Sequence, residues 1–513
     1  MNFIKSIAGV SLITIFSRLL GFTRDFIIAY FFGVSLYTDS FFIAFKISNF
    51  FRSILAEGAL SQTFIPILST YKKDYDLKEI QKFVSNVLFF VILISMLLTI
   101  FFNIFSKSII LFIAPGFINS IDKLDISVIL LKIMFPYIIL ISLSVFIGSI
   151  LNVWNYFIIP AISPILLNFS MIVFSLVGIK YFDLSIYSLS WGVIFGGILQ
   201  CIYQLPYLKK INMLVLPKLN FKKFTDFKIF KNFLPLLLGN FINQISFVTN
   251  AIFSSKLKSG SISWIYYSDR LIEFPASVLG VSLSTILLPL LSKKKLLNNK
   301  KFYQLVIDKG LRISFLFALP CSFLLFFLSQ EIIESLFQYG NFTKFDTIKT
   351  KESLEFYSLG LIAFVFIKIL IQVFYAQKNT VIPSLISLFT FFLTQFMNLY
   401  FLEIFHHASF ALSSSLASWI NLILLFYFLY KKKLFYIKFR WIFFLFRVFL
   451  SSIVMSTFIY LLLSYIDLLS FENLILRLII LILTFLFGFF IYFICLFLLG
   501  FNIIKFFLYK NYI

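Results

Sequence analysis

The stretch SQTFIPILSTYKK, at residues 61–73, has a counterpart later in the chain. Residues 284–295 read STILLPLLSKKK, so a serine, a proline and a second serine recur at the same spacing, and lysines follow in both copies. Ser61 and Ser284 are 223 positions apart. Similarity at a fixed offset is the sequence signature of an internal repeat.

Two further places keep this offset. The corresponding segments are Ile159-Pro160 with Ile382-Pro383, and Tyr207 and Lys209-Lys210 with Tyr430 and Lys432-Lys433. Agreement at three separated places predicts two homologous six-helix halves, which are parallel because an even number of spans separates the copies. We expect an N-terminal six-helix lobe at 1–215, a C-terminal six-helix lobe at 224–433, and two additional transmembrane helices at 438–513. Such a duplication is typical of alternating-access transporters, although a scaffold protein could also arise this way.

The composition excludes a water-soluble protein. Of the 513 residues, 61% are hydrophobic and 13% are charged, and the mean hydropathy is +1.01. Soluble domains carry about 25% charged residues, so soluble enzymes, nucleic-acid-binding proteins and disordered chains are all excluded. Apolar stretches of about 20 residues predict an all-α polytopic membrane protein with about fourteen transmembrane helices. We place them at 7–31, 37–68, 83–106, 127–153, 160–180, 185–207, 230–255, 262–291, 311–330, 353–376, 381–402, 408–430, 442–466 and 477–501.

The net charge of +23 follows mainly from topology. Lysine and arginine are concentrated on alternate connections, at 72–82, 209–231, 293–312 and 431–440. The opposite connections hold few basic residues, among them Lys107, Lys123 and Lys256. By the positive-inside rule the basic connections lie in the cytoplasm, and both termini are predicted to lie there too.

The first expected helix carries three charged residues at membrane depth, Arg18, Arg24 and Asp25. On insertion scales they cost roughly 8–10 kcal/mol together, so they must face protein or water. Arg18 and Asp25 lie within about 20° of each other on a helical wheel, and Ser11 and Thr14 extend the same stripe. Arg24 lies well off this stripe and would need a kink, or a second wall of the cavity, to point inward.

Two more expected helices, one in each half, repeat this pattern. Their polar residues are Asp39, Lys46, Asn49, Arg52 and Glu57 in the helix at 37–68, and Asp269, Arg270 and Glu273 in the helix at 262–291. Ser277, Gly280 and Ser284 continue the second set at helical spacing. Lys132 and Lys368 are lesser candidates in other helices. The alternative for all of these charges is that they snorkel to an interface or form structural ion pairs.

The arginines indicate the class of ligand. Their planar fork of donors matches phosphate oxygens and stays charged in any environment. Arg18, Arg24, Arg52 and Arg270, placed around a central cavity, predict an anionic and phosphorylated cargo. The expected supporting polar residues of this cavity are Asp25, Lys46, Asn49, Glu57, Asp269 and Glu273. Because these carboxylates nearly balance the bases, the sign of the cavity stays a hypothesis.

Catalytic and metal-binding motifs are absent from the sequence. Cys201, Cys321 and Cys495 are isolated in or beside apolar segments, which argues against disulfides and thiolate metal sites. His406 and His407 are the only histidines, and we expect both to be solvated in a short polar connection. No phosphate-binding glycine loop, zincin signature or nucleophile elbow is present. We therefore predict a protein that is not an enzyme and that uses no cofactor.

Several segments closely resemble the MurJ (MviN) family of bacterial lipid II flippases. The main ones are FSRLLGFTRD at 16–25, TDSFF at 38–42, AEGA at 56–59 and YYSDRLIEFP at 266–275. APGF at 114–117, QLP at 204–206 and FQYG at 337–340 also look like family segments. The resemblance extends over almost the whole chain.

The resemblance implies a fourteen-helix member of the multidrug/oligosaccharidyl-lipid/polysaccharide exporter superfamily, in the cytoplasmic (inner) membrane of a bacterium. Such a protein moves lipid II, the undecaprenyl-diphosphate-linked peptidoglycan precursor, from the inner to the outer leaflet. In the family, the arginines that match Arg18, Arg24, Arg52 and Arg270 line the cavity and are required, and Asp39 matches a sensitive aspartate. The last two helices form a groove for the lipid tail. The implied partners are the lipid-linked precursor, membrane lipids and cell-wall synthesis proteins, with no nucleic acid.

The chain departs from the family pattern at two places. ISN at 47–49 stands where many members have LPN, and IQVF at 371–374 stands where many have APGF. These changes affect hinge positions more than the class of substrate. Two alternatives stay open. A drug/cation antiporter of the same superfamily would need neither cavity arginines nor two extra helices, and a non-transporting scaffold for cell-wall synthases would tolerate neutral residues at all four arginines.

Overall fold

The computed structural model describes residues 3–52, 61–181, 186–218, 245–246, 248–291, 300–377, 379–436, 439–466 and 474–501. Within these ranges the fold is helical, as predicted, and nine stretches are long and apolar enough to cross a membrane. Two of them, Ile121–Val153 and Val381–Lys431, each contain two α-helices. The chain is therefore a multi-pass membrane protein. It divides into two units, Met1–Ser263 and Trp264–Ile513.

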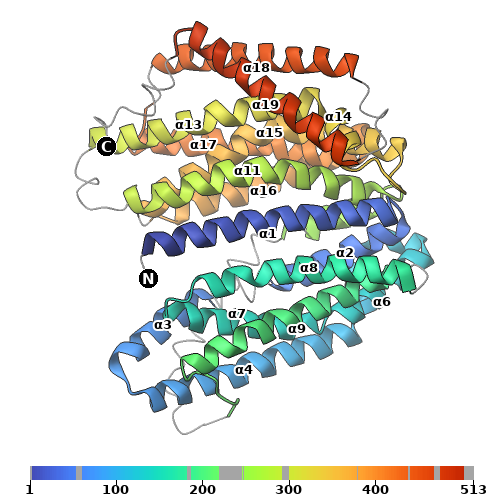
Figure 1. Ribbon diagram of the computed structural model, residues 1–513, viewed down its shortest axis with the longest axis vertical. Coiled ribbons are helices and arrows are strands. Elements are labelled where there is room, and N and C mark those ends of the chain that lie inside the picture. Colours follow the sequence, from blue (N-terminus) through green and yellow to red (C-terminus); the bar gives the residue numbers. More distant parts are fainter. Residues whose placement is uncertain are drawn as a thin grey trace. The chain divides into compact units, whose positions relative to one another are not determined.

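The first unit begins with the longest of its described helices (Figure 1). Its elements are α1 (Phe3–Phe32), α2 (Leu36–Phe51), α3 (Ser61–Asp74), α4 (Leu77–Ile104), α5 (Ser106–Ile113), the 3-10 helix η2 (Pro115–Asn119), α6 (Ile121–Met134), α7 (Tyr137–Val153), α8 (Ile158–Tyr181) and α9 (Tyr187–Lys210). α1 ends at Gly33, whose φ of 58° is a conformation that glycine adopts without strain. A capping box then starts α2, because the Ser35 hydroxyl accepts from the Thr38 amide and the Thr38 hydroxyl accepts from the Ser35 amide.

Glycines in α9 allow the helices of this unit to pack closely. A Cβ at Gly196 would lie 2.8 Å from Leu167 of α8, and a Cβ at Gly197 would lie 2.8 Å from Tyr137 of α7. Small residues at helix contacts let backbones approach each other, which is the usual means of helix packing in membranes. α9 therefore packs between α7 and α8, and α8 in turn packs against α1.

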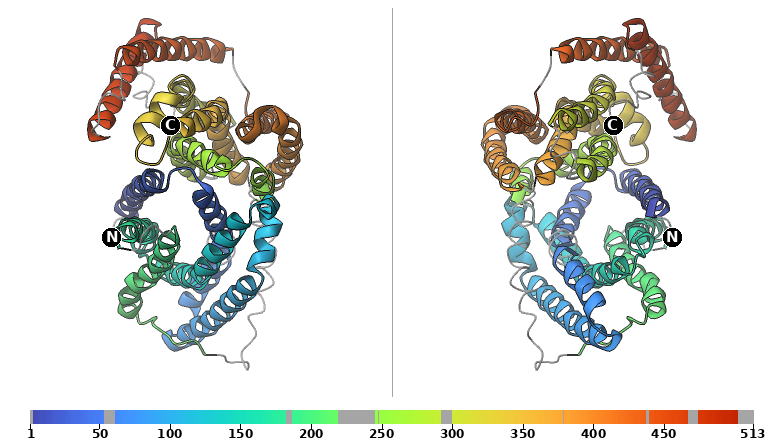
Figure 2. Two further views of the ribbon diagram at one scale, coloured as in Figure 1. Left: turned by 90° about the vertical axis from the view of Figure 1, so that its right-hand side faces the viewer. Right: turned by 90° about the vertical axis from the view of Figure 1, so that its left-hand side faces the viewer.

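The second unit contains the remaining helices. They are α11 (Ser261–Leu291), which starts just before the division between the units, α13 (Lys300–Phe327), α14 (Ser329–Leu336), α15 (Lys344–Ala376), α16 (Val381–Phe405), η4 (His406–Ala408), α17 (Ser409–Lys431), α18 (Arg440–Tyr465) and α19 (Leu474–Leu498). α15 packs against both α13 and α17, and α18 and α19 pack together (Figure 2). The hydroxyl of Tyr492 in α19 donates to the Leu316 carbonyl of α13 at 2.7 Å, which fixes the last helix to the unit.

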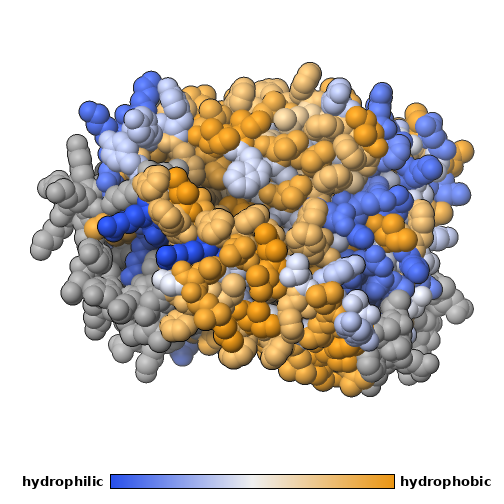
Figure 3. All heavy atoms as spheres, turned by 90° about the horizontal axis from the view of Figure 1, so that it is seen from above, coloured by the Kyte–Doolittle hydropathy of each residue, from blue (hydrophilic) through white to orange (hydrophobic). Residues whose placement is uncertain are grey.

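The outer face of α18 and α19 is apolar. Figure 3 shows a broad hydrophobic band with hydrophilic residues on both sides of it. The exposed apolar side chains of the two helices include Ile442, Phe443, Phe446, Leu461, Ile479, Leu483, Leu486 and Phe490. A face of this kind has hydrocarbon as its natural surroundings.

Candidate substrate-binding site

Arg24 and Asp25 form a buried ion pair on α1. Arg24 is 4% exposed and Asp25 is 1% exposed. The Arg24 Nε and Nη2 atoms donate to Asp25 Oδ1 at 2.9 and 2.6 Å, and Nη1 donates to Asn168 Oδ1 of α8 at 3.0 Å. The guanidinium also lies over the Phe45 ring, 5.4 Å from its centroid. The partnership offsets much of the cost of burying two charges, and α8 provides a second group that contacts Arg24 in the interior of the first unit.

Asn168 links this pair to the preceding turns of α1. Its Nδ2 atom donates to the Ser17 carbonyl at 3.2 Å. One side chain of α8 therefore holds both the backbone before Arg18 and the guanidinium of Arg24. Arg18 itself is half-buried.

Asp39 is buried at the start of α2, in a site made entirely of donors. Its carboxylate accepts from Gly260 N at 2.7 Å, from Ser263 N at 3.1 Å and from Ser263 Oγ at 2.7 Å. Lys123 Nζ of α6 lies 3.1 Å from Asp39 Oδ2. The helix N-terminus adds positive potential at the same place. Asp39 is 0% exposed, and this donor set accounts for a buried carboxylate in a membrane protein.

Gly260 and Gly116 are needed for this arrangement. Gly260 has a φ of 96°, which presents its amide to Asp39 and which other residues rarely adopt. The Gly116 amide donates to Ser255 Oγ at 3.1 Å, and a Cβ at Gly116 would overlap the Ser255 carbonyl. η2 therefore lies directly on the backbone that leads to Gly260 and Ser263.

The later part of α2 carries the other predicted polar residues of the first unit. Lys46, Asn49 and Arg52 are half-buried. Arg52 Nε donates to Asn49 Oδ1 at 3.1 Å, so Arg52 meets Asn49 although in a straight helix it was expected to lie well off the face of Asp39, Lys46 and Glu57. Glu57 lies outside the described residues.

Arg270 in the second unit is partly exposed and is held by its own helix. Its Nη1 atom pairs with Glu273 Oε2 at 3.0 Å, with side-chain exposures of 34% and 50%. Its Nε and Nη2 atoms donate to the Tyr266 hydroxyl at 3.2 Å each. Asp269 is exposed beside it. This part of α11 therefore presents one guanidinium and two carboxylates that are at least partly exposed.

The polar stripe of α11 changes its surroundings after Glu273. Ser277 and Ser284 are buried. Lys368 Nζ of α15 donates to the Ala276 carbonyl at 3.3 Å, and a Cβ at Gly280 would lie 2.8 Å from the Lys368 side chain. The second half of the stripe thus packs against α15. Lys132, the other lesser candidate, is exposed on α6.

Three residues of these clusters were not expected from the sequence. From the sequence, Lys123 was only one of the few basic residues in the non-cytoplasmic connections. In the structure it is the ion-pair partner of Asp39. Ser263 and Asn168 were not singled out either. Asn168 could have been identified from the sequence, because a side-chain amide within an otherwise apolar span needs hydrogen-bond partners. Lys123 and Ser263 had none, because their roles come from contacts distant in sequence.

The expectation that both histidines are solvated was wrong for one of them. His406 is exposed, but His407 is 3% exposed. The His407 Nε2 atom lies 2.8 Å from the Lys349 carbonyl, and its ring packs against Trp264. The turn of η4 places the two neighbours on opposite sides, which adjacency in the sequence did not reveal.

Comparisons with known proteins agree with one another. The sequence model of the family described as lipid II flippase MurJ matches residues 28–481. A probable lipid II flippase MurJ from Buchnera aphidicola subsp. Acyrthosiphon pisum is 52% identical over 434 residues, which cover 85% of each chain. The family match therefore includes the elements from α2 to α18, with the end of α1 and the beginning of α19.

Solved structures give the same result. A structure titled lipid II flippase MurJ, inward closed conformation, matches with a TM-score of 0.79 and 29% identity, covering 95% of this chain and 97% of that one. An inward-facing multidrug resistance MATE family transporter of the MOP superfamily matches with a TM-score of 0.68 and 10% identity, covering 83% and 98%. The second likeness concerns the fold alone.

Proposed function

Because the chain belongs to the MurJ family of lipid II flippases, we propose that it moves lipid II from the inner to the outer leaflet of the cytoplasmic membrane by alternating access, for cell-wall synthesis. The observation that carries this proposal is the match of the family over residues 28–481. The transporter fold supports it, and so do the charged residues of α1, α2 and α11. The protein makes and breaks no covalent bond in this process.

The half-exposed arginines are the groups that hold the head of the lipid. Arg18, Arg52 and Arg270 each keep part of the side chain accessible. Guanidinium groups bind diphosphate oxygens in a bidentate manner and keep their charge at any depth. Arg24 is buried in its ion pair with Asp25, so it contributes to binding the lipid head from a less accessible position. Lys46, Asn49, Glu57, Asp269 and Glu273 are the supporting polar groups.

The proposed role of Asp39 is to connect helices of the first unit, and not to bind the substrate directly. Its four donor contacts join α2, α6 and the start of α11, all within residues 1–263. A transport cycle that separates these elements has to exchange those donors for water or for the polar head of the cargo. Asp39 is therefore placed to couple substrate arrival to a change of conformation.

The lipid tail stays in hydrocarbon during this process. The apolar outer face of α18 and α19 supports a groove for the polyprenyl chain, formed by the additional helices at 438–513. The two repeated lobes, at 1–215 and 224–433, then carry the head. The distribution of lysine and arginine supports a cytoplasmic position for both termini.

The membrane potential can drive the transport step. One elementary charge moving across about 100 mV gains roughly 2.3 kcal/mol, so a dianion moving toward the positive outer side gains about 4–5 kcal/mol. No nucleotide-binding motif in the sequence offers another source of energy.

Complementation tests this function. A bacterium depleted of its own flippase is supplied with the wild-type chain or with Arg18→Ala, Arg24→Ala, Arg52→Ala or Arg270→Ala, at matched membrane abundance. We expect wild type to restore growth and each variant to fail. Failure of the wild type would contradict the function, and growth with all four variants would contradict the site.

A further inference from the structure

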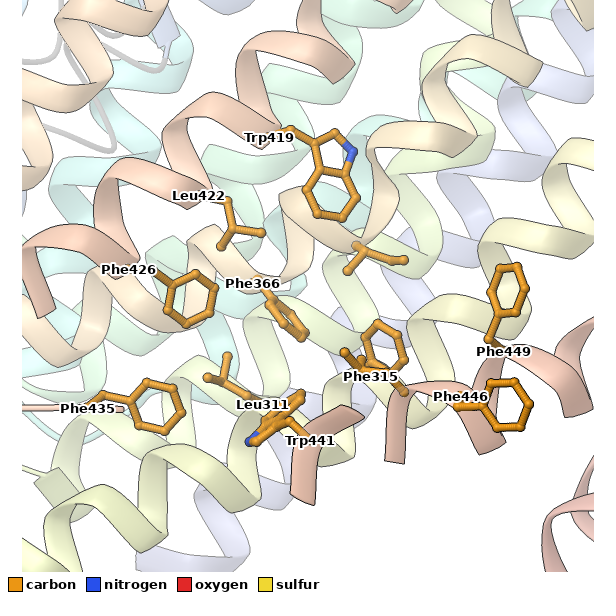
Figure 4. A pocket seen from close by; sticks show the side chains of 12 residues that line it. Leu311, Phe315, Phe366, Trp419, Leu422, Phe426, Phe435, Trp441, Phe446 and Phe449 are labelled. Atoms are coloured by element: carbon orange, nitrogen blue, oxygen red, sulfur yellow. The ribbon is translucent and has the colours of Figure 1, made fainter. Parts of the chain in front are cut away.

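An apolar cavity of about 480 Å³ lies within the second unit, between α13, α15, α17 and α18. Figure 4 shows its lining, which consists of leucine, isoleucine, phenylalanine and tryptophan side chains. Phe315, Phe366, Leu422 and Phe435 are among them. A cavity of this size and polarity suits a hydrocarbon ligand.

The two tryptophans in the lining add no donor to the cavity. Trp419 Nε1 donates to the Leu359 carbonyl at 2.9 Å, and Trp441 Nε1 donates to Asp308 Oδ1 at 2.6 Å. Asp308 is also paired with Arg312 at 2.9 Å. Water in the cavity would find few partners among these side chains, because an ordered water needs two to four polar neighbours.

The depth of the cavity is close to that of one leaflet. Its lining residues on α18 run from Trp441 to Phe449, which corresponds to about 12 Å of helix. One leaflet of a bilayer with a hydrocarbon core of about 30 Å is about 15 Å deep. Phe435 and Trp441 lie toward one end of the cavity and Trp419 toward the other (Figure 4).

Basic residues adjoin Phe435 and Trp441 in the sequence. Lys431, Lys432 and Lys433 precede Phe435, and Arg440 precedes Trp441, and all four are exposed. The proposed orientation places these residues at the cytoplasmic surface. Basic groups at the cytoplasmic mouth of a pocket between helices favour anionic lipid heads.

We propose that this cavity holds an anionic glycerophospholipid of the inner leaflet, with one acyl chain between α13, α15, α17 and α18 and its phosphate among Lys431, Lys432, Lys433 and Arg440. The inference rests on the proposed membrane orientation and not on the transport of lipid II. The lipid fills the space between α18 and the rest of the unit, and so steadies the two last helices against α13.

The charge and the depth of the site favour a resident lipid over the tail of the cargo. A head held at the cytoplasmic mouth stays in the inner leaflet, whereas the head of the cargo has to leave it. A polyprenyl chain is also longer than one leaflet. A glycerophospholipid with one chain in the cavity meets both conditions.

Quenching of tryptophan fluorescence tests the proposal. The full-length protein is reconstituted in phosphatidylcholine vesicles with graded amounts of phosphatidylglycerol brominated in its acyl chains, since bromine quenches indoles on contact. We expect a saturable component, half-complete at a mole fraction about fivefold lower than with brominated phosphatidylcholine, the factor expected from one basic residue near an anionic lipid. This saturable component should disappear in the double variant Trp419→Phe/Trp441→Phe. It should persist in Trp191→Phe, which changes an exposed indole outside the cavity.

Charge variants complete the test. Replacing Lys431, Lys432, Lys433 and Arg440 by glutamine is expected to abolish the preference for phosphatidylglycerol. The matched control, Lys209→Gln with Lys210→Gln, alters the repeat-related lysines at the end of α9 and is expected to keep it. Equal quenching by both lipids, a component that survives the two cavity substitutions, or stronger displacement by polyprenyl phosphate than by phosphatidylglycerol would overturn the proposal. Complementation by the wild type tests transport independently of lipid binding. A failure of the proposed function can therefore be distinguished from a failure of the lipid-binding proposal.

Discussion

Arg24 and Asp39 are buried and engaged within the first unit, whereas Arg18, Arg52 and Arg270 keep part of their side chains accessible. On the proposed function, this difference separates the arginines that are accessible to a ligand from the charged residues that bind other parts of the protein. A buried ion with a full donor set cannot be removed without leaving its partner unpaired, which is the costly case.

Substitution of Asp39 tests its structural role. Asp39→Asn leaves Lys123 buried without its carboxylate, so we expect a loss of about 3–5 kcal/mol in the free energy of unfolding. Lys123→Met added to Asp39→Asn should recover part of this loss. Denaturant unfolding of the purified protein in detergent measures both effects. Asp122→Asn, which alters an exposed neighbour, is the control, and unchanged stability in Asp39→Asn would refute the buried pair.

Substitution of Arg270 tests its role toward the ligand. Arg270→Lys keeps the charge but loses the planar fork, so we expect transport to fall about tenfold to a hundredfold, equivalent to the 1.5–3 kcal/mol of a hydrogen bond to a charged group. The control is Glu79→Gln, which removes the partner of Lys82 from an exposed ion pair outside the site and should stay close to wild type. Flux into the outer leaflet at matched protein abundance is the measurement. Equal flux in Arg270→Lys and wild type would argue against bidentate binding.

At the scale of the helices, hydropathy predicts the apolar spans well and their charged ends poorly. The helix expected at 262–291 is α11, Ser261–Leu291, and the helix expected at 408–430 is α17, Ser409–Lys431. α13 starts at Lys300 and not at 311, because its first turns carry charged residues that resemble a connection. α15 starts at Lys344 and not at 353, and the capping box of Thr343 and Asp346 was the signal for that start.

The candidate site was predictable only in part, for a physical reason. Helical spacing identifies residues that are neighbours on one helix, such as Arg270 and Glu273, which form an ion pair. It contains no information on packing between helices. The contact of Arg24 with Asn168 joins positions 144 residues apart and depends on how α1 lies on α8.

The contact between η2 and the end of the helix at 248–255 is open to a direct test. Gly116→Ala would place a Cβ against the Ser255 carbonyl, and backbone on both sides leaves little room to adjust. We expect lower abundance and a destabilisation of about 1–3 kcal/mol, as for other overpacked sites. Gly9→Ala is the control, since its Cβ would meet only the tip of the Ile158 side chain. A Gly116→Ala protein as stable as wild type would show that this contact is dispensable.

For the whole molecule, the proposed export of an anionic head predicts a dependence on the membrane potential. In proteoliposomes, an inside-negative potential should speed the movement of lipid II outward, and an ionophore that removes the potential should slow it. The gain of roughly 2.3 kcal/mol per charge at about 100 mV sets an upper limit of about fiftyfold per uncompensated charge. A rate independent of the potential would mean that compensating ions move with the cargo.

The most direct measurement follows the head of lipid II itself. Proteoliposomes with lipid II in the leaflet that corresponds to the cytoplasm are treated with an external enzyme that cleaves the head from the polyprenyl chain. We expect time-dependent cleavage with wild type and with the control Lys107→Ala. We expect none above the protein-free background with Arg18→Ala, Arg52→Ala and Arg270→Ala combined in one folded protein. Cleavage by that triple variant at the rate of wild type would contradict the claim that these arginines hold the diphosphate in transit.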